Sequence, residues 1–162
     1  MAIKQNAPFR ADVVGSFLRP AVLKETRLKF AGKQISADEL KSVEDKCIRE
    51  LVRKEKEAGL KVATDGEFRR SYWHLDFFWG LQGVEHNVMS QGYLFHGEET
   101  RADSARLSGK VRFNPEHPFL EHFKFLKGIV SDGVLPKQTI PAPSQFYAEL
   151  TRGENGQSIG RL

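Results

Sequence analysis

Residues 36–68, SADELKSVEDKCIRELVRKEKEAGLKVATDGEF, decide the fold of this 162-residue chain. Ser36 followed by Glu39 has the pattern of a capping box, in which the two side chains satisfy free amides in the first turn of a helix. Apolar residues then recur at helical spacing, and Gly59 is the kind of residue that ends a helix in a left-handed conformation. The apolar stripe consists of Leu40, Val43, Cys47, Ile48, Leu51 and Val52. The pattern predicts one long helix from Ser36 to Gly59, with Cys47 buried on its apolar face.

Short apolar runs lie on both sides of this predicted helix. Residues 11–14 form one run, which ends at Gly15 and Ser16, and residues 60–64 form another, which ends at Asp65. Runs of this length bounded by turn-forming residues are typical of buried strands. A strand, a helix and a second strand in this order favour parallel pairing through a right-handed crossover. The segment therefore predicts an α/β fold.

The later part of the chain repeats this pattern. Apolar residues at helical spacing predict a helix over residues 119–130, and Gly133 lies shortly beyond its end. Residues 135–140 predict a strand, which must stop at Pro141 because prolines interrupt the ladder of a sheet. Residues 147–151 predict the beginning of another helix. These elements extend the alternation of strands and helices.

Between these regions, residues 70–114 lose the regular alternation and gather aromatic side chains. Short strands are predicted over residues 93–96 and 106–113, and we expect them to pair as a ribbon. A connection of this length inside a domain is usually either functional or a sign that its regular elements have been assigned wrongly. Its aromatic residues include Tyr72, Trp73, Phe77, Phe78, Trp79, Tyr93 and Phe95. The sequence therefore predicts a long, aromatic-rich excursion from the α/β core.

The composition narrows the class of protein. With 40% hydrophobic and 28% charged residues, the chain suits one globular domain, or part of one, rather than a disordered segment. No run approaches the roughly 18 apolar residues of a membrane span. The single cysteine excludes an intrachain disulfide and is typical of a reducing compartment. The net charge of +4 is interleaved with acids, unlike a nucleic-acid-binding stripe. We therefore expect a cytoplasmic protein with a weak preference for anionic small molecules and with no membrane or nucleic-acid partner.

Polar residues follow the predicted strands. In parallel α/β folds the carboxyl ends of the strands carry the binding groups, because the loops there surround one opening. The residues expected at this rim are Ser16, Asp65, Glu67 and Ser144. The Glu67 carboxylate can accept from an ammonium group, while the Ser16 hydroxyl and nearby amides can hold a carboxylate, which suits an α-amino acid. Spacing alone leaves open that Asp65 and Gly66 form a plain turn and that Glu67 is a solvated loop acid.

Two segments resemble a known family. Residues 14–17 (VGSF) and 65–70 (DGEFRR), separated by the capped helix, resemble the catalytic barrel of cobalamin-independent methionine synthase, specifically its shorter single-barrel relatives. Residues 140–144 (IPAPS) are similar to a later strand end of that family. The Asp-Gly-Glu-Phe block is the most specific part of a resemblance that runs over residues 11–150.

The resemblance implies the amino-terminal half of a TIM-like (β/α) barrel over residues 11–150. Residues 1–10 are then an amino-terminal arm and residues 151–162 an irregular tail. A complete eight-stranded barrel takes about 250 residues, whereas only three or four strands can be counted here. A half-barrel leaves strand edges unpaired, so we expect self-association or a complementary half-barrel as a partner.

The resemblance also implies the transfer of a methyl group from 5-methyltetrahydrofolate to the thiol of homocysteine. Val14, Gly15 and Ser16 match the position that holds the carboxylate of homocysteine. Glu67 matches the acid that holds its amino group. The candidate folate contacts are Trp73, Arg101 and Arg106. For the aromatic excursion, packing of its side chains on the rim of the barrel is as good an interpretation as contact with the folate.

Zinc activates the sulfur in this family, but its ligands are His, Cys and Glu residues from the other half of the barrel. Cys47 lies on an apolar stripe, where a buried hydrophobe is the simpler interpretation. His117 and His122 are five residues apart and point to different faces of a helix. We therefore predict no metal site in this chain, and we expect the chain alone to be inactive. A related barrel that uses a corrinoid donor or another thiol acceptor, and an inactive assembly module, remain alternatives.

Overall fold

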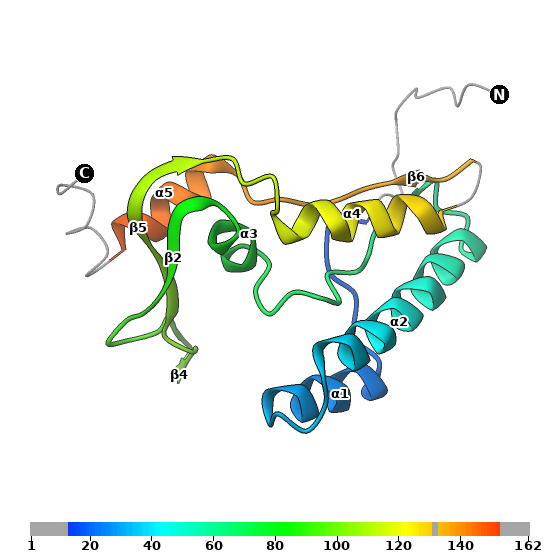
Figure 1. Cartoon of the computed structure of the whole chain (residues 1–162), viewed down its shortest axis with the longest axis horizontal. Helices are drawn as coiled ribbons and strands as arrows, with labels where there is room; N and C mark the ends of the chain where they lie inside the picture. Colours follow the sequence, from blue (N-terminus) through cyan, green and yellow to red (C-terminus); the bar gives the residue numbers. More distant parts are fainter. Residues whose placement is uncertain (1–12, 131–132, 153–162) are drawn as a thin grey trace. The chain divides into compact units, whose positions relative to one another are not determined.

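The computed structural model describes residues 13–130 and 133–152, which form a mixed α/β chain (Figure 1). The described residues separate into two compact units. Unit 1 runs to Arg70 and also includes residues 121–139, and unit 2 consists of residues 71–120 and those from Ile140 onward. The predicted arm, residues 1–10, and residues 153–162 of the predicted tail lie outside the described residues. The α/β class is confirmed.

The helices of unit 1 include the one that the capping box predicts. Helix α2 (Ala37–Glu57) has Ser36 as its N-cap, with Glu39 N donating to Ser36 Oγ at 3.2 Å and Ser36 N donating to Glu39 Oε2 at 2.8 Å. Gly59 follows its end with a φ of 82°, as predicted. Helix α1 (Ala21–Ala31) is not predicted, because it lacks a side-chain cap and Leu23 is its only buried residue.

The sheet of unit 1 is small. Strands β1 (Val62–Ala63) and β6 (Leu135–Pro136) are parallel neighbours, in register at Val62 and Leu135. Both are shorter than the strands predicted over residues 60–64 and 135–140. The strand predicted over residues 11–14 is wrong at its two described positions, because residues 13 and 14 belong to no strand. A barrel therefore stays a prediction.

The core of unit 1 lies between its helices. Leu23 and Ile48 are fully buried, and so is Leu126 of helix α4 (Pro118–Ile129), which confirms the second predicted helix. The stripe of α2 packs into this core, including Cys47. Burial of each large aliphatic side chain stabilises the fold by roughly 2 kcal/mol relative to exposure. Helix α2, with β1 after it, is thus firmly placed, and the loop that follows β1 begins from a rigid base.

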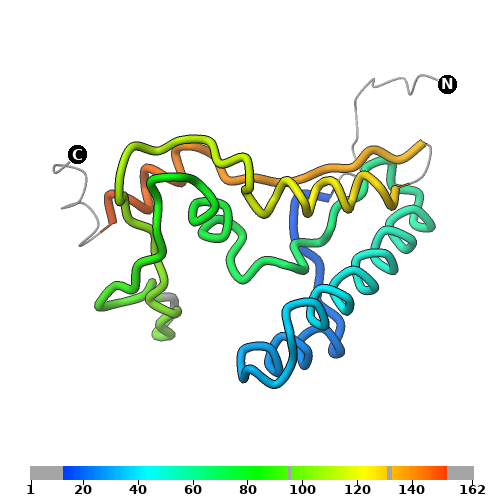
Figure 2. The backbone as a smooth tube through the Cα atoms, viewed as in Figure 1, coloured from blue at the N-terminus to red at the C-terminus, as the bar shows by residue number. Residues whose placement is uncertain are grey.

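Unit 2 contains most of the predicted excursion. Its elements are α3 (Leu75–Trp79), β2 (Gln82–Val88), β3 (Leu94–Phe95), β4 (Glu98–Glu99), β5 (Asp103–Arg112) and α5 (Pro143–Thr151). Strands β2 and β5 are antiparallel and their backbones run side by side (Figure 2). Helix α5 begins at Pro143 rather than at residue 147, since proline fits the first turn of a helix.

The predicted pairing of residues 93–96 with residues 106–113 is wrong. Strand β3 pairs instead with β4, while β5 pairs with β2, which was not predicted. His96 and Gly97 have φ values of 47° and 87°, and two positive φ values in a two-residue loop close a tight hairpin. Because this turn pairs β3 with the neighbouring β4, β5 is left to pair with β2.

Candidate functional site

The loop that follows β1, residues 64–70, holds Glu67 in an unusual conformation. We call it the acidic loop. Gly66 and Glu67 both have positive φ values, 63° and 59°. A left-handed conformation costs a residue with a Cβ roughly 1–2 kcal/mol. Two local hydrogen bonds offset this cost: Gly66 N donates to Thr64 Oγ1 at 3.1 Å, and Glu67 N donates to Asp65 Oδ1 at 2.9 Å.

The Glu67 carboxylate is buried and only half engaged. Glu67 is only 8% exposed, so it is not a solvated loop acid. Its Oε1 accepts from Arg70 Nη1 at 3.1 Å and from Thr139 Oγ1 at 3.0 Å. Within the described residues, no hydrogen bond reaches Oε2. One oxygen is therefore fixed by the protein while the other is left for a further donor.

Residues 13–17 lie against the acidic loop. Phe17 N donates to Gly66 O at 3.1 Å, and a Cβ placed on Gly15 would lie 3.3 Å from Glu67 Oε1. Ser16 is exposed, and its hydroxyl makes no hydrogen bond among the described residues. Val14 is 85% exposed. The structure thus brings the two predicted motifs together at Gly15 and Glu67.

A second acid beneath the loop was missed by sequence reasoning. Glu55, 3% exposed, extends from α2 and accepts from Thr64 N at 3.1 and 3.2 Å through its two oxygens. Burial, together with the charge of Asp65, raises the pKa of Glu55 to about 7. Glu55 follows Leu51 and Val52 at helical spacing, so its position on the apolar stripe was the available signal.

Asp65 is itself almost fully buried, at 4% exposure. Its Oδ1 accepts from Glu67 N, whereas its Oδ2 is buried without a hydrogen-bond partner in the part of the chain that the structure describes. Ser144, the other predicted rim residue, is exposed in the first turn of α5 and belongs to unit 2. Its place at a common rim stays a prediction.

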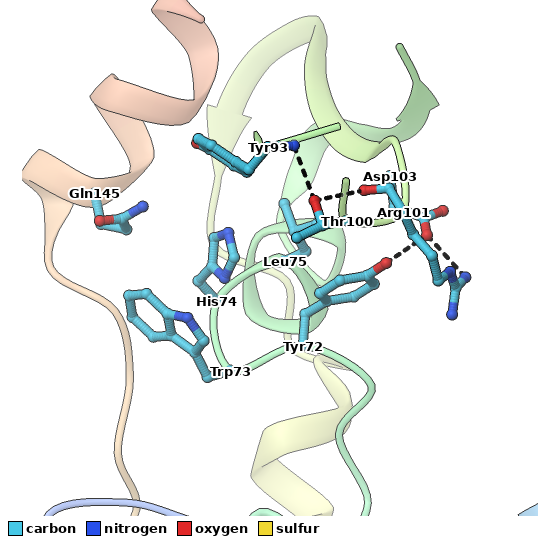
Figure 3. Close-up of a pocket in the computed structure, with 9 residues that line it drawn as sticks. All are labelled: Tyr72, Trp73, His74, Leu75, Tyr93, Thr100, Arg101, Asp103 and Gln145. Atoms are coloured by element: carbon cyan, nitrogen blue, oxygen red, sulfur yellow. Dashed lines mark hydrogen bonds and ion pairs between the residues drawn. The ribbon is translucent and has the colours of Figure 1, made fainter. Parts of the chain in front are cut away.

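Unit 2 contains an aromatic pocket of about 390 Å³ (Figure 3). Of the candidate folate contacts, Trp73 and Arg101 line it, whereas Arg106 does not and pairs with Glu85 at 2.6 Å. The pocket is lined by Tyr72, Trp73, His74, Leu75, Tyr93, Thr100, Arg101, Asp103 and Gln145. A cavity of this size with aromatic walls and a few polar groups is typical of a small-molecule site.

Asp103 holds three side chains, two of which, Tyr72 and Arg101, line this pocket. It accepts from Tyr72 OH at 2.5 Å, from Arg101 Nη2 at 2.8 Å and from His86 Nε2 at 2.6 Å. The hydrogen bond from Tyr72 lowers the pKa of Asp103, and burial with this bond raises the pKa of Tyr72 to about 12. Tyr72 therefore stays protonated, and the Arg101 guanidinium is held over its ring at 5.5 Å.

Glu149 fixes the other side of the pocket. This fully buried carboxylate accepts from Ser104 Oγ at 2.5 Å and from Tyr93 OH at 3.2 Å. Burial alone would raise its pKa, but interactions with His74, Ser104 and Arg152 lower the pKa to about 2. Two pocket residues, His74 and Tyr93, are thus held by one ionised group.

The described residues do not fit a zinc site. Among them, no group of three or more His, Cys, Asp or Glu side chains could hold a metal ion. Cys47 is buried in the core, and burial, with the charge of Glu44, raises the pKa of its thiol. His117 caps α4, since its Nδ1 accepts from Phe119 N at 3.1 Å.

Among the described residues, no helix has the length and apolar character to cross a membrane.

The chain resembles proteins of one family in sequence and in structure, although no protein-family model matches it. Bacillus subtilis YxjH, itself uncharacterised, is 45% identical over 144 residues, which cover 89% of this chain and 38% of YxjH. A methionine synthase of Sulfolobus acidocaldarius is 44% identical over 123 residues, covering 72% of this chain and 33% of that protein. A Listeria monocytogenes crystal structure, provisionally assigned as a vitamin-B12-independent methionine synthase, matches with a TM-score of 0.74 and 44% identity.

The Listeria match covers 90% of this chain and 40% of that chain. This chain therefore spans between about a third and two fifths of the length of these relatives. The relatives confirm the family resemblance predicted from residues 14–17 and 65–70, and they confirm that it concerns part of a longer protein.

Proposed function

We propose, from the resemblance of this chain to cobalamin-independent methionine synthases, that it carries the amino-acid-binding part of a homocysteine S-methyltransferase site. The observation that carries the proposal is the half-engaged carboxylate of Glu67 beside Gly15. A buried carboxylate with one fixed and one open oxygen is a directed acceptor for the α-ammonium group of an amino acid.

The carboxylate of the ligand is assigned to Val14, Gly15 and Ser16. The Ser16 hydroxyl is exposed and available as a donor, and Gly15 has no side chain to separate this segment from Glu67. Asp65 is a supporting residue at the rim, because its Oδ1 accepts from Glu67 N and so holds the backbone that carries the Glu67 carboxylate. Together these groups match the two charged ends of an α-amino acid.

For the methyl donor we propose 5-methyltetrahydrofolate, with the aromatic pocket of unit 2 as its binding site. Tyr72 and Trp73 offer flat surfaces to a fused ring, and Arg101, held by Asp103, offers donors to a carboxylate or carbonyl oxygen. Arg106 remains a weaker candidate, since it lies outside the lining and is paired with Glu85. In the reaction, the homocysteine sulfur bonds to the methyl carbon as a thiolate, having given up the thiol proton. The bond from that carbon to N5 of the folate breaks, and N5 takes up a proton, so that tetrahydrofolate leaves.

The family resemblance implies zinc as the group that makes the homocysteine sulfur a thiolate. The described residues supply no such site, so this chain contributes recognition, and we expect no turnover from it alone. We also propose that its elements are part of a TIM-like barrel and that it acts in the cytoplasm. Both proposals go beyond the observed α/β class and the family resemblance.

Assembly with another chain is a second candidate function. Several large apolar side chains of unit 1 face solvent, among them Leu18, which is 93% exposed, and Leu28. Exposed apolar side chains grouped on one segment are typical of surfaces that another chain covers. A second copy of this chain or a complementary half-barrel would meet this requirement, and the ligand chemistry would then belong to the assembly.

The proposal is tested by the chemistry of the ligand. In calorimetric titrations, L-homocysteine should bind, whereas 4-mercaptobutanoate should bind at least about tenfold more weakly, because it lacks only the α-ammonium that Glu67 accepts. Equal affinity for the two thiols would contradict the role assigned to Glu67. Absence of homocysteine binding would contradict the proposed function.

A further inference from the structure

The Arg19 side chain joins two segments that are about fifty residues apart in sequence. Arg19 Nη2 donates to Glu67 O and to Arg70 O, both at 2.7 Å, and Arg19 Nε donates to Phe68 O at 3.4 Å. One guanidinium therefore binds three carbonyl groups of the acidic loop. Arg19 itself belongs to residues 13–20, which have no regular secondary structure.

These contacts act where the loop is least stable by itself. Glu67 has a φ of 59°, a conformation that persists only when the surroundings over-determine it. Hydrogen bonds from a charged donor are stronger than those between neutral groups, and the planar guanidinium presents several donors in fixed directions. Arg27 adds bonds to Phe68 O at 3.3 Å and Arg69 O at 3.1 Å, but it does not reach Glu67 O.

We propose that Arg19 is the positioning residue of the amino-acid site. This inference rests on the proposed function. By binding the Glu67 and Arg70 carbonyl groups, Arg19 sets the backbone from which the Glu67 carboxylate extends. Because Arg19 follows Ser16 by three residues, the same bonds also hold the segment that binds the ligand's carboxylate. Arg19 thereby fixes the distance between the two groups that receive the two ends of the amino acid.

Lysine cannot replace arginine in this role. Its ammonium is a single point of charge on a flexible stem and cannot reach three carbonyl groups in fixed directions. The Arg19→Lys variant keeps the charge and the apolar stem, so it isolates the geometry. The matched control is Arg53→Lys on α2, where an exposed arginine pairs with Glu50 and Glu57 away from the acidic loop.

The first measurement is amide hydrogen exchange on the full chain. In Arg19→Lys the amides of residues 66–70 should exchange about tenfold faster than in the parent protein, while amides within α2 should be unchanged. Arg53→Lys should leave the acidic loop as it is. Unchanged exchange at residues 66–70 in Arg19→Lys would overturn the inference.

The second measurement is calorimetry with L-homocysteine. Arg19→Lys should weaken binding about tenfold, and Arg53→Lys should not weaken it. Faster exchange with unchanged affinity would show that Arg19 only stabilises the loop, which also overturns the positioning role. If the parent protein does not bind homocysteine, the proposed function fails, whereas the exchange measurement still decides whether Arg19 holds the loop.

Discussion

Glu67 combines two features that a loop residue ordinarily avoids, a positive φ and a buried carboxylate. A glycine would adopt this backbone without strain, and a solvated acid would avoid the cost of burial. The strain and the burial are offset by specific partners: Arg70 and Thr139 bind its Oε1, and Asp65 binds its amide. A residue held so closely in an unfavourable state is expected where a ligand requires it.

Glu55 makes the stability of the protein depend on pH. Its pKa is raised to about 7 from an ordinary value of 4.5, so the folded state favours the protonated form. The stabilisation from protonated Glu55 is present below about pH 4.5 and is lost as the pH rises to about 7, an effect of up to about 3 kcal/mol. In urea titrations, Glu55→Gln should therefore gain stability relative to the parent protein between pH 5 and pH 8.

The control for this prediction is Glu57→Gln, on the exposed face of the same helix. Glu149 and other acids with lowered pKa values change stability mainly at lower pH, and they affect the parent protein and the Glu55 variant equally. The difference in unfolding free energy between Glu55→Gln and the parent protein must therefore change with pH. A constant difference would show that Glu55 is ionised throughout this range.

At the scale of elements, local signals predicted the helices better than the strand pairs. Helix α2 follows from its capping box and apolar stripe, which all lie within one segment. The pairing of β2 with β5 depends on residues far apart and on the tight turn at His96 and Gly97, whose first residue is not a typical turn former. Pattern alone could not choose the partner of β5, because β3 also offered a short apolar run.

A substitution at Gly83, in β2, tests the register in which β2 pairs with β5. It lies at an irregularity between Gln82 and Val84, has a φ of 79°, and a Cβ there would lie 2.5 Å from Lys110 O. Because that contact is with backbone, Gly83→Ala should lower the free energy of unfolding by roughly 1–3 kcal/mol. Gly109→Ala is the matched control, since its Cβ would meet nothing closer than 4.0 Å. Equal effects of the two substitutions in urea titrations would contradict the register.

At the scale of the whole molecule, the sequence predicted both motifs of the candidate site but not the groups that support them. Ser16 and Glu67 were recognised from their segments, and the structure places Gly15 against Glu67. Arg19 was missed because its partners are about fifty residues away, and a single arginine in a polar segment carries no local signal. The aromatic pocket was predicted only as a concentration of rings, because its shape depends on the pairing of β2 with β5.

The central claim is that Glu67 receives the ammonium group of homocysteine, and calorimetry of Glu67→Gln tests it most directly. Glutamine keeps the size of the side chain and removes its charge, and Glu57→Gln is the control for loss of an exposed carboxylate. We predict that Glu67→Gln weakens L-homocysteine binding by about tenfold or more, while Glu57→Gln binds like the parent protein. Equal affinity of Glu67→Gln and the parent protein for L-homocysteine would contradict the account.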